Sequence, residues 1–262
     1  MSKLNLGLYI LALYVIFIVH KIQGGKLHPT IKKAWYEQVF PSNNDGGINY
    51  FATHETAPAS YFGLVAIMDV YGHNISDGRI LTGIWIHNRQ PDPKIDVNAI
   101  WVGWQVWPRH YGDSRTHFFT TWTRDSYRTG CYDMACPAFQ LASGSKIVPG
   151  TPIKHASDVN GKRQKITIKI FREKSTGNWW IHYGFNKAPR TVRYYLAKLF
   201  NRLGKVTDIG IGSVVVRNGD APSPPMGSGF PQSDKAATIT DISFITEDGR
   251  IRDASTEIRD QK

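Results

Sequence analysis

A run of aromatic residues near the middle of the chain carries side chains that suit ligand binding. The segment 99–113 reads AIWVGWQVWPRHYGD, with three tryptophans within seven positions and no carboxylate before Asp113. Successive side chains of an extended strand point to opposite faces, so Trp101, Gln105 and Trp107 share one face. Flat rings beside an amide can stack on proline rings or sugar faces while the amide forms a hydrogen bond. We predict that these three residues line a binding groove; the alternative is that the tryptophans fill a second core layer.

The other face of the same strand predicts a core contact. Ile100, Val102, Trp104 and Val106 form an unbroken apolar row, and such a row packs against the interior of a sheet. Gly103 stands between two of the tryptophans and leaves room above the sheet for a ligand chain to approach. The strand is therefore expected to have a core side and a groove side.

Few other residues have the spacing of a reaction centre. Asp113 and Asp125 lie near the tryptophan strand in sequence and are candidate carboxylates for acting on water. The sequence has no Gly-x-Ser-x-Gly, His-Glu-x-x-His or phosphate-loop motif, so a serine, metal or nucleotide enzyme is not supported. The two cysteines have no nearby histidine and fall short of a zinc set. We predict neither a metal nor a cofactor.

The start of the chain has the pattern of a secretory signal. Residues 4–19 form an uncharged apolar run after Lys3 and before a Gly-Gly pair, as in signal peptides with a small-residue cleavage region. We expect residues 1–24 to be removed, residues 25–54 to form an N-terminal extension and residues 55–262 to form one domain. The run is short for a membrane span, so no stable membrane anchor is expected, and an uncleaved signal anchor is the alternative interpretation.

Secretion gives a meaning to two further features. Thiols in an oxidising compartment tend to pair, so Cys131 and Cys136 are expected to form one small disulfide loop. Closing so short a loop stabilises a fold by roughly 2 kcal/mol. The sequon Asn74-Ile75-Ser76 marks Asn74 as a candidate N-glycosylation site on a turn.

The net charge of the chain indicates which classes of partner it can bind. The formal net charge of +11 falls to +9 when residues 1–24 are removed, because that segment contains Lys3 and Lys21 and no acid. A positive field favours anionic partners such as acidic polysaccharides, whereas nucleic acid is not expected because the basic residues are scattered. The densest basic group, residues 190–205, predicts one short helix with a solvated basic face. Its apolar residues at helical spacing are Val192, Tyr195, Leu196, Leu199 and Leu203.

Elsewhere the chain predicts one strand after another, separated by Gly, Pro, Asn or Asp. The expected strands are Leu64–Val70, Ile80–His87, Thr116–Arg124, Lys165–Arg172, Asn178–Gly184, Asp208–Val216 and Ala237–Thr246. The first two of these are expected to be neighbours in one sheet. Residues 218–236, rich in proline and glycine, predict a long ordered loop. So many short strands indicate an all-β sandwich or barrel.

Three stretches resemble one known family. The segments GWQVWPRHYGDSRTHFFTTWTRDSYRTGCYDMAC (103–136), TGNWWIHYG (176–184) and PPMGSGFP (224–231) are similar to the neprosin domain of plant secreted glutamic endopeptidases. The resemblance runs from about Glu55 to Phe244. It implies an antiparallel β-sandwich with a groove across one sheet, and secretion into the cell wall or apoplast. It also implies peptide hydrolysis on the carboxyl side of proline at acidic pH, by a pair of glutamates acting on water.

The sequence departs from that family at the two glutamates. The first family glutamate stands two positions before the glycine of the Gly-Trp-Gln element, with one residue between them, and here that position is Trp101. The second family glutamate aligns within Ile211–Val214, where Ser213 occupies its position. No acid occurs from Ile209 to Asn218. One carboxylate must accept a proton from the water while another acidic group stabilises or protonates the intermediate. Tryptophan and serine do neither at mild pH, so no catalytic residue is predicted.

The sequence therefore predicts a secreted, catalytically inactive neprosin-like protein. It is expected to bind a proline-containing peptide or an acidic polysaccharide through Trp101, Gln105 and Trp107. The alternative is an acid prolyl endopeptidase of the glutamic type that uses displaced carboxylates. Asp113 and Asp125 are the candidates for that role, although the Tyr-Gly-Asp context favours a turn for Asp113.

Overall fold

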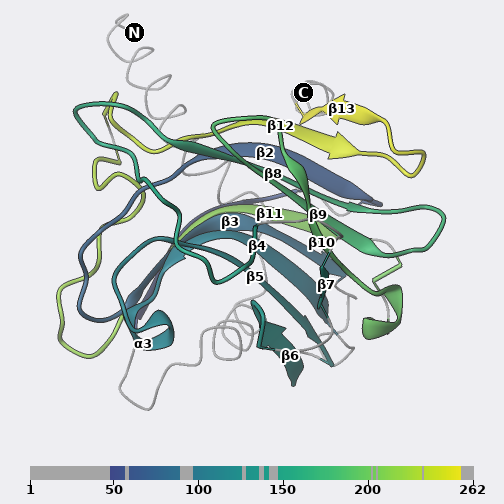
Figure 1. Cartoon of the computed structure of the whole chain (residues 1–262), viewed down its shortest axis with the longest axis horizontal. Coiled ribbons are helices and arrows are strands. Elements are labelled where there is room, and N and C mark those ends of the chain that lie inside the picture. The colour runs from purple at the N-terminus through teal and green to yellow at the C-terminus, as the bar shows by residue number, and fades with distance from the viewer. Residues whose placement is uncertain are drawn as a thin grey trace, which may run out of the picture.

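Two antiparallel sheets packed face to face form the molecule (Figure 1). The computed structural model describes residues 48–56, 59–88, 97–125, 128–135, 139–141, 147–201, 203–204, 206–231 and 233–254. In spatial order, the six-stranded sheet comprises β1 (Ile48–Glu55), β11 (Asp208–Arg217), β3 (Arg79–Asn88), β4 (Asn98–Val106), β5 (His117–Arg124) and β6 (Thr129–Tyr132). The seven-stranded sheet comprises β13 (Ile251–Asp253), β12 (Ile239–Ile245), β2 (Gly63–Asp69), β8 (Lys165–Arg172), β9 (Trp179–Phe185), β10 (Arg190–Tyr195) and β7 (Phe139–Leu141). The predicted all-β sandwich is confirmed.

The main core lies between the two sheets. The predicted apolar row of β4 points into it, and every member of the row is buried. Ile166, Ile168 and Ile170 of β8 face it from the other sheet, as their alternation predicts. The indole nitrogen of Trp104 donates a hydrogen bond to the backbone oxygen of Asp69 on β2, at 2.9 Å, and so ties the two sheets together.

The outward face of the six-stranded sheet is apolar as well. A second buried cluster covers it, and its members are Leu81, Trp85, Ala99, Trp101, Phe119 and Val214. Phe51, Tyr132 and Val216 pack partly buried around this cluster. Antiparallel sheets commonly expose one polar face to water, so an apolar outward face is a distinctive feature of this sandwich.

The expected pairing of the first two predicted strands was wrong. Leu64–Val70 lies in β2, which pairs with β8 and β12 in the seven-stranded sheet. Ile80–His87 lies in β3, which pairs with β4 and β11 in the other sheet. The connection between β2 and β3 therefore crosses from one layer to the other and is not a hairpin.

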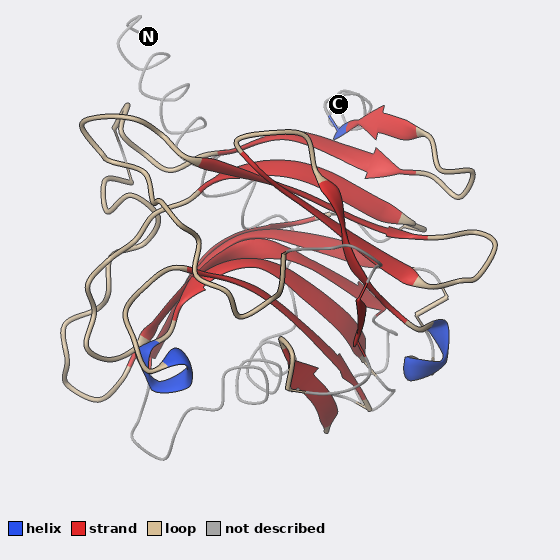
Figure 2. Ribbon diagram, in the orientation of Figure 1, coloured by secondary structure: helices blue, strands red, loops and turns tan. Residues whose placement is uncertain are grey.

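The helix predicted over residues 190–205 was also wrong. Residues 190–195 form β10, and Ala197–Leu199 form one 3₁₀ turn, η1 (Figure 2). Val192 and Tyr195 are buried in the main core, but they reach it from a strand that pairs with β9 on one side and β7 on the other. β-Branched and aromatic residues favour a strand when such partners are available.

A short helix stands instead directly after the tryptophan strand. Helix α3 (Pro108–Tyr111) has proline at its first turn, where the missing N–H costs no hydrogen bond. It ends at Gly112, whose φ of 77° is left-handed, and the backbone N–H of Gly112 donates to the carbonyl of Pro108. This single turn folds Tyr111 back toward β4.

Several predictions at the chain start lie outside the described residues. These are the signal peptide at residues 1–24 and residues 25–47 of the N-terminal extension. Within the ranges that the structure does describe, no helix has the length and apolar character needed to cross a membrane.

Candidate functional site

Trp101 is buried, and the predicted open groove at this residue was wrong. Its side chain is 1% exposed. Trp85 stands directly opposite on β3, and the two rings stack with centroids 5.2 Å apart and planes at 28°. Gly210 on β11 makes room for Trp85, because a methyl group there would overlap the indole nitrogen. The alternative of a second core layer holds for Trp101, since its ring belongs to the second buried cluster together with Trp85.

Ser213 lies on the opposite face of the sheet from Trp101. Its hydroxyl is 2.7 Å from the hydroxyl of Thr82 on β3, and Thr82 pairs with Trp104, whose side chain faces the main core. The two positions expected for a glutamate pair therefore cannot converge on one water molecule. On β11, the positions on the face of Trp101 are Gly210, Gly212 and Val214. Because side chains alternate along a strand, Ser213 cannot share the face of Trp101.

Gln105 is the centre of a buried polar network on the outward face. Its side chain is 0% exposed. The side-chain oxygen accepts hydrogen bonds from Nε of Arg79 at 2.9 Å and from a terminal guanidinium nitrogen of Arg79 at 2.6 Å. The side-chain nitrogen donates to the hydroxyl of Tyr111 at 2.6 Å. Tyr111 in turn donates to Oδ2 of Asp133 at 2.7 Å, so the amide of Gln105 connects a buried cation to a buried carboxylate.

Trp107 marks the place where this network reaches the surface. Its ring stacks on His110 with centroids 4.7 Å apart, and Tyr132 meets both rings at 5.7 and 5.6 Å. The guanidinium carbon of Arg79 lies 4.3 Å from the centroid of Trp107 on its inner side, a cation–π arrangement. Trp107, His110 and Tyr132 are all at least partly exposed. Of the three predicted groove residues, only Trp107 is accessible to a ligand.

Asp133 is the carboxylate that sequence reasoning missed. It lies directly after the Gly-Cys-Tyr element, with a left-handed φ of 46°, and its Oδ1 accepts a hydrogen bond from the backbone N–H of Thr120 at 3.0 Å. Burial, and next the charge of Asp133, raise the pKa of Tyr111 well above its usual range. Tyr111 therefore stays protonated and keeps donating to the carboxylate. The only signal for Asp133 in the sequence was that it lies inside a segment that resembles the neprosin family.

Asp113 and Asp125, the two candidate carboxylates, occupy structural positions. Asp113 accepts hydrogen bonds from the backbone N–H and the guanidinium of Arg115, at 2.8 and 2.6 Å, and lies 2.9 Å from Nε2 of His117. The Arg115 contact first, and the His117 contact next, hold the pKa of Asp113 well below its usual range, which makes it a poor base. Asp125 binds Thr129 and lies in the turn after β5, at the end of the sheet opposite to Gln105.

A second pair of titratable side chains lies beside Trp101. Nδ1 of His87 is 3.1 Å from Oδ1 of Asp208, and Oδ2 of Asp208 accepts a hydrogen bond from Thr207 at 2.9 Å. The ring of His87 meets that of Trp101 edge-on, with centroids 6.4 Å apart. Both side chains of the pair are buried. The sequence showed no spacing that would have linked His87 to Asp208, which are brought together by the pairing of β3 with β11.

Two further predictions are only partly described. Cys131 lies on β6 and has no free thiol, whereas Cys136 lies outside the described residues, so their pairing stays a prediction. Asn74 is exposed, and its side-chain oxygen accepts a hydrogen bond from Ser114 at 3.0 Å. Glycosylation at Asn74 likewise stays a prediction.

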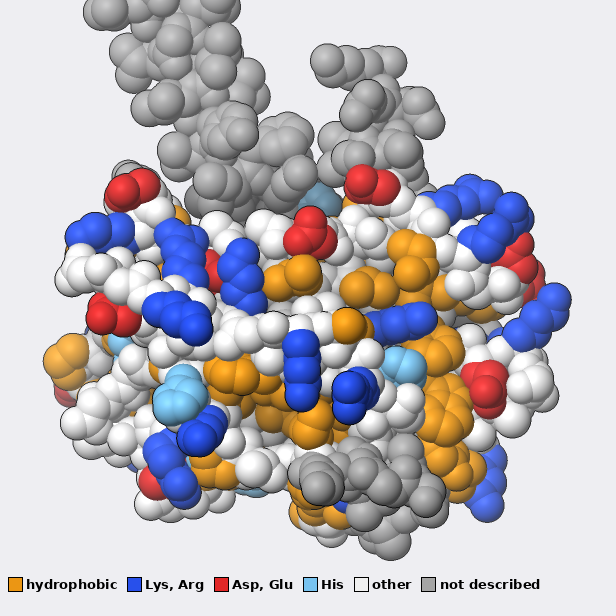
Figure 3. Space-filling view, turned by 45° about the horizontal axis from the view of Figure 1, so that its top comes forward, with side chains coloured by type: hydrophobic (Ala, Val, Ile, Leu, Met, Phe, Trp, Pro, Cys, Tyr) orange, Lys and Arg blue, Asp and Glu red, His pale blue; other side chains and the backbone are white. Residues whose placement is uncertain are grey.

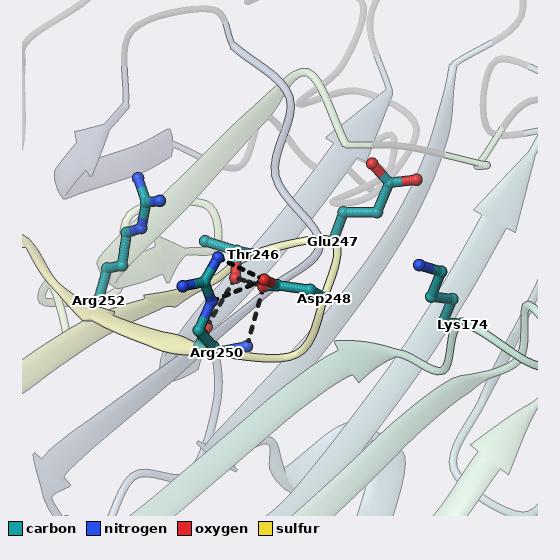
Figure 4. A pocket seen from close by; sticks show the side chains of 6 residues that line it. All are labelled: Lys174, Thr246, Glu247, Asp248, Arg250 and Arg252. Atoms are coloured by element: carbon teal, nitrogen blue, oxygen red, sulfur yellow. Dashed lines mark hydrogen bonds and ion pairs between the residues drawn. The ribbon is translucent and has the colours of Figure 1, made fainter.

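An open pocket elsewhere on the molecule has a different character. It is lined by Lys174, Thr246, Glu247, Asp248, Arg250 and Arg252 at the β12–β13 turn (Figure 4). The guanidinium of Arg250 binds Asp248 at 2.6 Å, and this contact holds the pKa of Asp248 well below its usual range. The pocket belongs to the seven-stranded sheet and has no part in the network around Gln105.

The fold and the site together define an antiparallel β-sandwich in which the Trp-Gln, Tyr-Gly-Asp and Gly-Cys-Tyr elements meet around one buried glutamine. The family described as Neprosin has a sequence model that matches residues 79–261. This match covers more than half of the chain, which therefore belongs to the neprosin family.

Three solved structures resemble the chain distantly. A scytalido-glutamic peptidase with a peptide-based transition-state analogue is 10% identical, with a TM-score of 0.37, over 75% of this chain and 79% of that one. The β-porphyranase BpGH16B from the human gut bacterium Bacteroides plebeius is 11% identical, with a TM-score of 0.39, over 73% and 65%. CG-16, a homodimeric agglutinin from chicken liver, is 10% identical, with a TM-score of 0.29, over 72% and 99%.

Proposed function

We propose that this chain is a secreted neprosin-family protein that does not hydrolyse peptides and instead binds them at the Trp107 end of its six-stranded sheet. The observation that carries the proposal is the burial of Trp101 against the equally buried Trp85, at the position where the family is expected to have a catalytic glutamate. A peptidase of the glutamic type needs a carboxylate and a water molecule at the same open place. Stacked indole rings leave room for neither.

The Trp107 cluster supplies what a peptide-binding site needs. Trp107 and His110 present stacked rings, and Tyr132 adds a third ring at their side. Proline packs well on such faces because its ring is apolar and rigid, so little conformational freedom is lost on binding. Arg79 supports the cluster from the buried side, through Gln105 and the ring of Trp107. We assign the family's expected preference for proline-containing peptides to this cluster.

A cleavage assay and a binding assay test the two halves of the proposal. The purified mature protein is incubated with proline-containing peptides across about pH 3 to 7, where carboxylates titrate, and no cleavage products are expected. Binding of the same peptides is then measured by calorimetry, with alanine in place of proline as the comparison. Trp107→Ala is expected to weaken binding severalfold, and Trp180→Ala, at a partly exposed tryptophan of the other sheet, to leave it unchanged. Equal binding by Trp107→Ala and the wild type would show that this cluster is not the peptide-binding site.

The alternative function is acid hydrolysis by displaced carboxylates. Asp133 favours it most, because its carboxylate lies beside the accessible rings, 3.7 Å from Nε2 of His110. Specific cleavage after proline, abolished by Asp133→Asn at an unchanged melting temperature, would establish this alternative. Asp208→Asn tests in the same way whether the buried pair of His87 and Asp208 supplies the carboxylate. Cleavage that survives both changes would point to a contaminating protease.

A further inference from the structure

The outward face of the seven-stranded sheet combines aromatic rings with positive charge. Phe171, Trp180 and Tyr194 stand side by side on β8, β9 and β10, because Trp180 pairs directly with the other two. All three are partly exposed. With neighbouring strands about 4.8 Å apart, this row spans about 10 Å. Exposed aromatic rows of this kind are uncommon on a face that only meets water.

The rings of this row are in mutual contact. Trp180 and Tyr194 have centroids 4.5 Å apart, and Phe171 meets His182 edge-on at 5.2 Å. His182 lies in the next row, where its Nε2 is 3.1 Å from the hydroxyl of Thr191. Burial first, and then the charge of Lys169, lower the pKa of His182, so the ring is neutral near pH 7. The face thus offers apolar ring surface and hydrogen-bonding groups on adjacent strands.

Two lysines supply the charge on this face. Lys165 and Lys169 share one side of β8, about 13 Å apart along the strand, and the ammonium of Lys169 lies 4.6 Å from the ring centroid of Phe171. Neither ammonium forms an ion pair with any of the described residues. No Asp or Glu occurs in β8, β9 or β10. Asp69, opposite Lys165 on β2, already binds Arg163 at 3.1 Å and Thr238.

The positive charge continues at the end of the same sheet. Figure 3, with the seven-stranded layer turned toward the viewer, shows Lys and Arg side chains beside hydrophobic ones across this face. The open pocket of Figure 4 begins at Lys174, two residues beyond β8, and Arg252 points away from its ion-paired neighbours. Lys174 and Arg252 have no ion-pair partner in the described part of the chain. Lys174 and Arg252 therefore add two cations at this end of the sheet, in a pocket that Glu247 and Asp248 also line.

We propose that the outward face of β8, β9 and β10 binds a linear polysaccharide that bears carboxylates. The rings of Phe171, Trp180 and Tyr194 offer apolar surface to the C–H faces of the sugars. Lys165 and Lys169 bind the carboxylates, and Thr167, Thr191 and His182 bind hydroxyls. Each exposed ion pair contributes little, but repeated contacts along one polymer raise the overall affinity. This site lies on the other sheet from the Trp107 cluster and does not depend on the peptide-binding proposal.

A matched pair of polymers tests the charge and the ring contacts. Binding of polygalacturonate and of its methyl ester, which has the same backbone without the charge, is measured by calorimetry at low and high salt. Polygalacturonate is expected to bind at least tenfold more tightly at low salt, and salt is expected to weaken it because it screens exposed charges. Equal binding of the two polymers would overturn the proposal.

Variants locate the site, and each is checked for an unchanged melting temperature. Lys169→Glu is expected to weaken polygalacturonate binding about tenfold, Lys169→Ala less, and Trp180→Ala severalfold. Trp107→Ala should leave this affinity unchanged while it weakens peptide binding, so failure of one proposal is distinguishable from failure of the other. If Trp107→Ala alone lost polygalacturonate binding, the polysaccharide site would lie on the six-stranded sheet and not on β8, β9 and β10. Tighter binding to phosphatidylserine vesicles or to duplex DNA than to polygalacturonate would replace the polysaccharide as the ligand class.

Discussion

Trp85 on β3 and Trp101 on β4 face each other across the strand pair, and their rings stack with centroids 5.2 Å apart. Both rings are buried, at the place where the family is expected to have a catalytic glutamate. The accessible part of the face lies at Trp107, six residues further along the chain. The outward face of the six-stranded sheet thus has a filled middle and an open aromatic end.

Removal of the Trp101 ring is expected to destabilise the protein strongly. Trp101→Ala leaves a cavity beside Trp85, and a buried aromatic replaced by alanine costs about 3 to 5 kcal/mol of unfolding free energy. Denaturant unfolding measures the loss, with Trp107→Ala as the control that should cost much less. Peptide binding per folded molecule should not change. A stable Trp101→Ala protein with weakened binding would return Trp101 to the ligand site.

A methyl group added at Gly210 of β11 is expected to disturb the contact between Trp85 and Trp101. In Gly210→Ala the new Cβ would overlap the indole nitrogen of Trp85, which has no room to move because it is buried. We expect a lower melting temperature, as for an overpacked core position. Gly204→Ala is the matched control, since nothing lies within 4 Å of a Cβ there. Similar melting temperatures for the two variants would mean that Trp85 adapts.

The Asp113 turn is expected to weaken in acid. The pKa of Asp113 is lower in the folded protein than its ordinary value of 3.8, mainly through Arg115. A depressed pKa means that the stabilising contribution is present above the unfolded value and is lost as pH falls through the folded value. Melting temperatures between about pH 2 and 6 should therefore fall less steeply toward acid in Asp113→Asn than in the wild type. An identical slope in both proteins would show that the contact does not stabilise the fold.

Expression in a eukaryotic secretory host tests the predictions outside the described residues. The secreted protein should lack residues 1 to about 24 and have Cys131 bonded to Cys136. Intact-mass analysis with and without a reducing agent measures both. Cys136→Ser should leave a reactive thiol at Cys131. A retained apolar start, or two free thiols in the secreted protein, would contradict the secretion argument.

Local rules were enough to predict most strands and their two faces. β8 has the bounds that its alternation predicts, and the row from Ile100 to Val106 lies in the core. Both predictions depend on the two-residue period of a strand, which requires no knowledge of its neighbours. The resemblance to the neprosin family also came from contiguous motifs, and the family match confirms it.

Predictions that depended on a partner strand were less successful. Residues 190–205 have apolar spacing that fits a helix, but β9 and β7 offered backbone partners to residues 190–195. The sequence also gave no means of placing β2 and β3 in different sheets. A strand's partners come from distant parts of the chain, and local propensity does not specify them.

The candidate site likewise has features that the sequence predicts and features that depend on neighbouring strands. The sequence by itself determined that Trp101, Gln105 and Trp107 share a face, because that follows from their spacing along one strand. Only the tertiary structure decided that Trp101 is buried against Trp85, that Ser213 points to the other face, and that Gln105 reaches Asp133 through Tyr111. The physical reason is that exposure and hydrogen bonding depend on which residues of distant segments, such as β3 and the turn after β6, lie beside β4 and α3, and those neighbours are fixed by the packing of the whole sheet.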